Sequence, residues 1–252
     1  MQAQPPPRPE GLSLVQLLPN LLTLAALCSG LTAIRFAAQG AFAMAVGLIL
    51  LAALLDGLDG RVARRIGGES ALGAELDSLC DVVSFGVAPA LVMYFWAFDV
   101  GSGNGWIAAL VYAAACALRL ARFNIGSRDP LAVAQPKKTF TGVPSPAGAV
   151  LVLLPLHVAH VLPDAPIPPV PLLALWMVFV AALMVSRLPT PAFVTVSIPP
   201  AQARLLLLGL VGAMAALIVH PWLTLVVVDV GYLLLLLRGW VLIRRRHARK
   251  DG

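Results

Sequence analysis

DGLDGRVARRIGGESALGAELDSLCD, residues 56–81, holds four aspartates within a chain of 252 residues that is 60% hydrophobic and only 12% charged. Long apolar stretches precede and follow this segment on both sides. An ionised carboxylate inside hydrocarbon is costly, so acidic residues at such positions indicate a functional site. The four candidate residues are Asp56, Asp59, Asp77 and Asp81.

The apolar stretches determine the expected fold class. A helix crosses a bilayer with roughly 20 residues, and apolar runs of about this length recur from residue 17 to residue 243. We therefore predict an all-α, polytopic membrane helical bundle with about eight transmembrane helices. The predicted spans are 17–38, 41–65, 71–97, 105–124, 142–162, 170–187, 204–219 and 222–243. Residues 1–16 would form a disordered cytoplasmic tail, and residues 244–252 a basic cytoplasmic tail.

Charge alternates between the connections of this predicted topology. All of the 18 lysine and arginine residues except Arg35 fall at or near one face. Basic connections stay in the cytoplasm, so this face and both termini are predicted to be cytoplasmic. The net charge of +6 thus has a topological cause, and no basic stripe interleaved with aromatic residues suggests a nucleic-acid partner. Cys28, Cys80 and Cys116 lie far apart in apolar runs, without the spacing of a zinc site.

The aspartates should lie on two neighbouring helices. The pair Gly67–Gly68 interrupts the helix that ends at Arg65, and Ser70 is a suitable N-cap for the next one. Asp56 and Asp59 are three residues apart, and Asp77 and Asp81 are four apart, so each pair shares a helix face. At about 1.5 Å of rise per residue, Asp77 and Asp81 lie roughly 10 and 16 Å beyond the cap. All four can meet in a pocket that is open to the cytoplasm.

Clustered carboxylates repel one another unless a cation or protons neutralise them. Oxygen-only ligands suit Mg²⁺ or Mn²⁺, and two such ions form the clamp used for displacement at phosphorus. Small residues between the acids would let a bulky ligand, or the facing helix, approach closely. These small residues are Gly57, Gly60, Ala63, Gly73 and Ala74. A purely structural pairing of the aspartates remains an alternative at this point.

The residue pattern resembles that of a known family. Asp56-x2-Asp59-Gly60-x2-Ala63-Arg64-x8-Gly73-x3-Asp77-x3-Asp81 is similar to the signature of the CDP-alcohol phosphotransferases. Further segments, one of which overlaps the end of this signature, resemble the integral-membrane phosphatidylserine synthases of bacteria, and the likeness extends over about residues 14–190. These segments are PNLLTLAALCSG (19–30), GAELDSLCDVVSFGVAPA (73–90), LRLARFN (118–124), FTGVPSPAGA (140–149) and LMVSRLPTP (183–191).

The resemblance implies an activity and a role for each matching residue. Residues 17–243 would be a catalytic domain that transfers the phosphatidyl group of CDP-diacylglycerol to L-serine and releases CMP. Asp56, Asp59 and Asp77 would hold two divalent ions, Mg²⁺ or Mn²⁺, with help from Asp81, which would also be the general base. Residues on the nucleotide and donor side would be Gly60, Ala63, Arg64, Gly73, Asn20 and Thr23. The family also implies a homodimer in the bacterial inner membrane.

The acceptor side is less defined by the sequence. Arg119 and Arg122 are suited to a carboxylate or to phosphates, because guanidinium binds both, although snorkelling to the interface is the alternative. Ser84 lies one turn beyond Asp81 and is a third candidate. His157 and the other three histidines have no partner at ligand spacing and are interpreted as packing or interfacial residues.

Other functions stay open on the sequence alone. The same chemistry could use glycerol 3-phosphate, inositol phosphate or choline as acceptor. A transporter of cations or protons could use the same carboxylates, but it would not explain their spacing. A lipid-binding protein without activity would not need all four acids.

Overall fold

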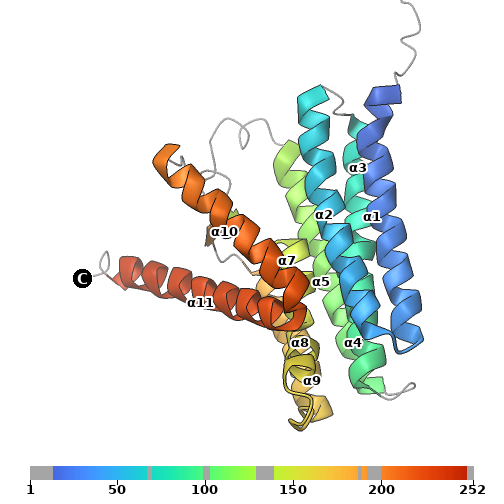
Figure 1. Ribbon diagram of the computed structural model, residues 1–252, viewed down its shortest axis with the longest axis vertical. Coiled ribbons are helices and arrows are strands. Elements are labelled where there is room, and N and C mark those ends of the chain that lie inside the picture. Colours follow the sequence, from blue (N-terminus) through green and yellow to red (C-terminus); the bar gives the residue numbers. More distant parts are fainter. Residues whose placement is uncertain are drawn as a thin grey trace, which may run out of the picture.

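The computed structural model describes most of the chain as helix. The described residues are 14–66, 70–98, 103–128, 139–186, 189–191 and 200–248. Figure 1 shows the long helices of the N-terminal half side by side in one bundle, and the last two helices leaving that bundle on one side. The predicted N-terminal tail falls largely outside the described residues.

Helices α1 (Leu14–Ala38) and α2 (Phe42–Ile66) form a tightly packed hairpin. Gly40, with φ of 77°, makes the turn between them. Both helices carry small buried side chains, which let membrane helices approach one another closely. These buried residues are Ala26, Ala33, Ala37, Ala45 and Ala52. The close approach matters because α1 and α2 both contribute residues to the site.

The third predicted span is not a uniform α-helix. It consists of α3 (Ala71–Asp81), a π-helical segment η1 (Val82–Val87) and α4 (Ala88–Ala97). The Ser70 hydroxyl accepts a hydrogen bond from the Gly73 N–H at 2.9 Å, which confirms the predicted N-cap. The π-helical segment was not predicted, and it begins directly after Asp81.

Pro89 gives a local reason for irregular bonding in this segment. Proline has no N–H to donate to the carbonyl four residues earlier, which here is that of Phe85. The Tyr112 hydroxyl on α5 (Gly103–Arg128) donates to the Phe85 carbonyl at 3.1 Å instead. Tyr112 and Phe85 are both fully buried, so this contact ties α5 to the segment that follows Asp81.

The C-terminal half continues with shorter elements. Helices α7 (Ser145–Val152) and α8 (Leu154–Val161) are separated at Leu153, just before Pro155. Helix α9 (Val170–Val185) packs along α5. A short antiparallel ladder pairs β1 (Thr139–Thr141) with β2 (Pro189–Pro191), an element that the all-α prediction did not include.

Helices α10 (Pro200–Val219) and α11 (Pro221–Ala248) complete the described chain. Helix α11 packs on α8 and also reaches β2 and α7. In Figure 1 its C-terminal part runs outward from the bundle, across the direction of α1 and α2. Helix α11 includes residues 244–248, which the sequence predicted to be part of a basic tail.

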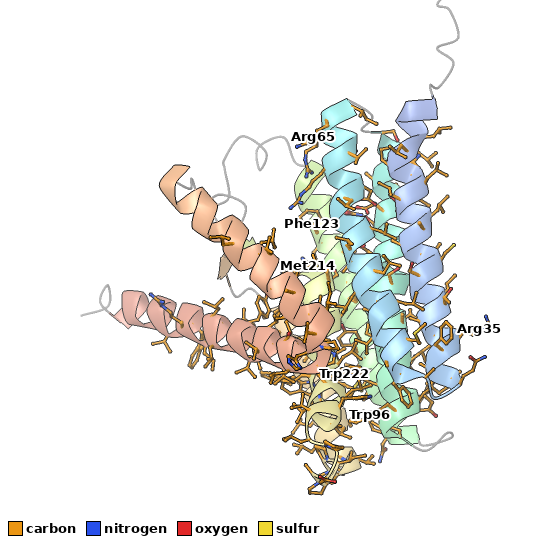
Figure 2. The ribbon with its side chains drawn as sticks, viewed as in Figure 1. Arg35, Arg65, Trp96, Phe123, Met214 and Trp222 are labelled. Carbon is orange, nitrogen blue, oxygen red and sulfur yellow. The ribbon has the colours of Figure 1, made fainter. Side chains whose placement is uncertain are left out.

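Within the described ranges, five helical stretches are long and apolar enough to cross a membrane: Leu17–Ala38, Phe42–Ile66, Leu72–Ala97, Gly103–Ile125 and Pro221–Val241. Val170–Val185 and Leu208–Val219 are apolar but shorter. The protein is thus a multi-pass membrane protein of helical fold, as predicted, whereas the number of eight crossings stays a prediction. Figure 2 shows Arg65 at one end of the α1–α2 hairpin and Arg35, the exception to the predicted charge bias, at the opposite end.

Candidate active site

Helices α2 and α3 bring three of the four aspartates together. Ligand oxygens of Asp56, Asp59 and Asp77 all lie within 4.8 Å of one another. Asp59 is buried, and the other two are half-buried. Three carboxylates at this spacing fit the oxygen-only coordination of a hard divalent cation. The three carboxylates therefore suit the Mg²⁺ or Mn²⁺ ions that the sequence predicted.

Asp81 lies beside this cluster. Its side chain is hydrogen-bonded to that of Asp56, so it borders the three-aspartate group. Two carboxyl groups can share a hydrogen bond only when a proton lies between them. Asp81 can accept a proton only as the carboxylate, a form that a cation held by Asp56, Asp59 and Asp77 would favour.

Thr23 of α1 is part of the cluster's surroundings. Its hydroxyl lies 2.6 Å from Oδ2 of Asp59, and both residues are buried. The same hydroxyl lies 3.1 Å from the Pro19 carbonyl, as expected of a threonine within a helix. The sequence suggested Thr23 only as a nucleotide-side residue. In the structure it orients one of the candidate metal ligands, which sequence spacing could not reveal because the two residues are on different helices.

A cavity of about 300 Å³ opens beside Asp59 and Asp77. Every residue predicted for the nucleotide and donor side lines it: Asn20, Thr23, Gly60, Ala63, Arg64 and Gly73. At Gly73 a Cβ atom would lie 3.0 Å from both Asn20 Oδ1 and Ser70 Oγ. Glycine at this position therefore keeps the helix N-terminus close to α1, and the cavity is bounded by α1, α2 and α3.

A second cavity, of about 420 Å³, also borders the cluster. Asp77 and Ala74 line both cavities, whereas Asp81 lines only the second. Arg119 of α5 faces the second cavity, and its Nη1 donates to Ser145 Oγ at 2.6 Å. The site thus has two compartments that meet at Asp77, one with the nucleotide-side residues and one with Asp81 and Arg119.

Two predicted acceptor residues lie outside both cavity linings. Arg122 Nη1 donates to the Val185 carbonyl at 2.7 Å, where a cation is favourable at the C-terminus of α9. Ser84 is buried in η1 and its hydroxyl donates to the Ala26 carbonyl at 3.3 Å. Both contacts tie helices together. Of the three acceptor candidates, the structure brings only Arg119 to the aspartates.

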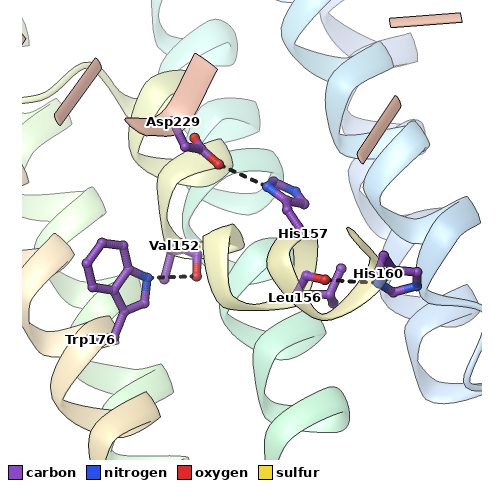
Figure 3. A network of polar contacts seen from close by, with 6 residues as sticks. All are labelled: Val152, Leu156, His157, His160, Trp176 and Asp229. Carbon is purple, nitrogen blue, oxygen red and sulfur yellow. Dashed lines mark hydrogen bonds and ion pairs between the residues drawn. The ribbon is translucent and has the colours of Figure 1, made fainter. Parts of the chain in front are cut away.

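The interpretation of His157 as a packing residue missed its polar partner. His157 Nδ1 lies 2.9 Å from Asp229 Oδ2, with the two side chains 0% and 3% exposed. The contact joins α8 to α11 (Figure 3). Asp229 is an acidic residue within an apolar stretch, and that feature alone indicates a buried partner or a functional role.

The chain belongs to the CDP-alcohol phosphatidyltransferase family, whose sequence model matches residues 16–186. It is therefore an enzyme of membrane lipid chemistry, and the resemblance seen in the sequence is confirmed. Enzymes of this family use divalent metal ions, in agreement with the three-aspartate cluster.

Individual proteins similar to this chain have more specific names than the family. The chain is 41% identical to a CDP-diacylglycerol–serine O-phosphatidyltransferase of Mycobacterium leprae, over 87% of this chain and 73% of the relative. It is 43% identical to the protein of the same name from Helicobacter pylori, over 55% of this chain and 56% of the relative. A crystal structure of Mycobacterium tuberculosis phosphatidylinositol phosphate synthase with CDP-DAG bound is 23% identical, with a TM-score of 0.48 over 69% of this chain and 82% of that one.

Proposed function

We propose that this enzyme transfers the phosphatidyl group of CDP-diacylglycerol to the hydroxyl of L-serine, giving phosphatidylserine and CMP. The observation that carries the proposal is the pair of cavities that share Asp77, one lined by the nucleotide-side residues and the other by Asp81 and Arg119. The names of the relatives from M. leprae and H. pylori support serine as the acceptor.

In the proposed reaction each of the two cavities binds a different substrate group. The cytidine would lie in the cavity beside Gly60, Ala63 and Arg64, where small residues leave room for it. The acceptor would enter the other cavity, with its hydroxyl toward Asp81 and its carboxylate toward Arg119. The diphosphate would bridge the compartments at Asp77, while the acyl chains stay in the surrounding lipid.

The proposed chemistry is a direct in-line displacement. Asp81 accepts the proton of the serine hydroxyl, and the serine oxygen forms a bond to the phosphorus that carries the diacylglycerol. The bond from that phosphorus to the CMP oxygen breaks, and CMP leaves. Two divalent ions, Mg²⁺ or Mn²⁺, held by Asp56, Asp59 and Asp77 with help from Asp81, would neutralise the diphosphate and stabilise the leaving CMP.

The proposal includes the cellular setting. The enzyme would lie in a bacterial inner membrane with the aspartates open to the cytoplasm, because the basic residues gather at that end. Both termini would be cytoplasmic, and the family resemblance favours a homodimer. The proposal also keeps the predicted transmembrane catalytic domain of residues 17–243, between the two tails.

The test is CMP release by the purified protein in detergent with CDP-diacylglycerol and either Mn²⁺ or Mg²⁺. L-serine, glycerol 3-phosphate, inositol phosphate and choline are offered separately, and a chelator with later readdition of metal tests the cofactor. We expect CMP release that requires both metal and serine. Release with another alcohol alone would contradict serine as the acceptor but keep the chemistry. No release from folded protein with any acceptor would favour the carboxylate-based transporter.

A further inference from the structure

The second cavity contains a pair of neutral polar side chains that the proposed reaction does not use. Ser78 of α3 and Asn124 of α5 both line this cavity, together with Asp81 and Arg119. Ser78 and Asn124 are half-buried rather than enclosed, so a molecule in the cavity can contact them. Ser78 precedes Asp81 by three residues, and residues at this spacing share a helix face.

The two side chains contact each other across the helices. Asn124 Nδ2 donates to Ser78 Oγ at 2.9 Å, and Asn124 Oδ1 lies 3.2 Å from the same oxygen. The Ser78 hydroxyl also lies 3.0 Å from the Ala74 carbonyl on its own helix. A hydroxyl has one proton to donate. When that proton goes to the nearer Ala74 carbonyl, Ser78 Oγ and Asn124 Oδ1 are two acceptors that face each other, and they favour a donor that reaches both.

The other polar side chains of this cavity already have a partner or a role. The two aspartates are assigned above to the metal ions and to the acceptor hydroxyl. Arg119 is a donor, and Ser145 Oγ accepts from it at 2.6 Å. The remaining lining residues have apolar side chains: Ala74, Leu120, Phe123, Pro144 and Pro146. Among the described lining residues, the side-chain acceptors left for a cationic group are therefore those of Ser78 and Asn124.

The cavity lies toward the end of the bundle that the positive-inside rule predicts to be cytoplasmic. Figure 2 shows Phe123, which lines the cavity, toward the same end of the bundle as Arg65. A water-soluble acceptor can reach this cavity from the cytoplasm without crossing the hydrocarbon.

An amino-acid acceptor brings a third group besides its hydroxyl and its carboxylate. An ammonium group has three N–H donors and no acceptor, so it needs oxygen partners wherever it is removed from water. In the proposed reaction the hydroxyl of serine faces Asp81 and the carboxylate faces Arg119. The ammonium group has no partner in that arrangement, although it is the group that distinguishes serine from a simple hydroxy acid.

We propose that Ser78 and Asn124 bind the ammonium group of the amino-acid acceptor and thereby select serine over alcohols that lack an amino group. The inference rests on the proposed function, which it deepens by naming residues that recognise the acceptor. Serine would be held at three points: the hydroxyl at Asp81, the carboxylate at Arg119 and the ammonium group at the Ser78–Asn124 pair. The pair determines specificity and position, whereas the displacement itself involves the hydroxyl.

The first test is Asn124→Leu, which keeps the approximate size of the side chain and removes its acceptor. L-serine is the substrate, and 3-hydroxypropionate, which is serine without the amino group, is added as a competitive inhibitor. We expect the KM for serine to rise by about 10- to 100-fold, the loss expected for hydrogen bonds to a charged group. The Ki for 3-hydroxypropionate and the KM for CDP-diacylglycerol should stay within about twofold, because neither ligand offers an ammonium group to Asn124.

The second test is Ser78→Ala, a smaller change to the same contact. The KM for serine should rise by about 3- to 10-fold, again without a change in the Ki for 3-hydroxypropionate. Ser29→Ala is the matched control, because the Ser29 hydroxyl also donates to the carbonyl four residues earlier, at 2.9 Å, and Ser29 lines neither cavity. It should leave the KM for serine unchanged. The double variant Ser78→Ala with Asn124→Leu should lose less than the product of the two single effects, because both residues bind one group.

The outcomes separate a binding role from a structural one. An unchanged KM for serine in both variants overturns the inference. So does an equal rise in the KM for serine and the Ki for 3-hydroxypropionate, because the pair would then only hold α3 against α5. Thermal unfolding in detergent shows whether each variant is folded, and if Asn124→Leu is not, the comparison of Ser78→Ala with Ser29→Ala decides.

Failure of the proposed function is visible in the wild-type protein alone. Wild-type protein without serine-dependent CMP release would contradict serine as the acceptor, and the ammonium assignment would fall with it. Serine-dependent release in the wild type, with no selective loss in the variants, would overturn the ammonium assignment and leave the proposed function intact.

Discussion

The carboxylate of Asp59 on α2 is hydrogen-bonded by a residue from another helix, α1. The Thr23 hydroxyl donates to its Oδ2, and such supporting hydrogen bonds orient metal-binding side chains and tune their affinity. The contribution of the Thr23 hydroxyl to metal binding can therefore be tested without changing a candidate metal ligand.

Thr23→Val keeps the shape of the side chain and removes the donor. We expect the Mn²⁺ concentration for half-maximal CMP release to rise by about 10- to 100-fold. Thr32→Val is the matched control on the same helix, because the Thr32 hydroxyl donates only to the Cys28 carbonyl one turn away. Equal metal dependence in the two variants would show that Thr23 does not support the metal site.

Asp81→Asn tests the assignment of the base. The amide keeps the size of the side chain but cannot accept the proton of the attacking hydroxyl, so CMP release should fall by at least about 100-fold. The melting temperature in detergent should change little. Asp164→Asn, at an exposed position in the connection between α8 and α9, controls for the loss of one negative charge. Full activity of Asp81→Asn would remove Asp81 from the role of base.

At the scale of elements, the ends of helices position the site. Gly142 joins β1 to α7 with φ of 82°, and a Cβ atom there would lie 2.5 Å from the Met184 carbonyl oxygen. The Val143 N–H donates to the Leu183 carbonyl at 3.3 Å, and Arg122 donates to that of Val185. The end of α9 is therefore joined to the start of α7, where Ser145 meets Arg119.

Gly142→Ala should destabilise the protein. The left-handed backbone costs about 1–2 kcal/mol for a residue with a side chain, and the close carbonyl adds to this. We expect the melting temperature to fall by about 2–4 °C for each kcal/mol lost. Gly47→Ala in α2 is the control, because a Cβ atom there meets nothing within 4 Å and alanine favours helix. A melting temperature of Gly142→Ala at or above that of Gly47→Ala would contradict this account.

At the scale of the whole molecule, the distribution of charge predicts the orientation in the membrane. Arg65 lies at the end of α2 nearest the start of α3, whereas Gln39 lies in the α1–α2 turn at the opposite end. The positive-inside rule places the first in the cytoplasm and the second outside.

Cysteine labelling tests this orientation. After replacement of Cys28, Cys80 and Cys116 by alanine, single cysteines are introduced as Gln39→Cys, Asp164→Cys and Arg65→Cys, all at exposed positions. A membrane-impermeant maleimide added to intact cells should label the first two and not the third. Permeabilised cells, in which all three should react, provide the control. The reverse pattern in intact cells would invert the topology and place the aspartates outside.

The sequence alone determined the class of fold and the residues of the cluster. Continuous apolar runs of about 20 residues form helices in a bilayer, because a helix satisfies all its backbone hydrogen bonds within the segment. The spacing of Asp56, Asp59 and Asp77 put them on facing surfaces of consecutive helices, because helical periodicity and a short connection leave little freedom. The N-cap at Ser70 followed from the same local rules.

Only the tertiary structure decided what joins distant segments. The Thr23–Asp59 bond, the pairing of β1 with β2 and the His157–Asp229 contact each link residues far apart in the chain. Local periodicity contains no information about which face of one helix meets which face of another, since the apolar faces of membrane helices are nearly interchangeable. The two cavities that share Asp77 exist because the helices pack in one particular arrangement. A few buried polar contacts between distant segments favour that arrangement.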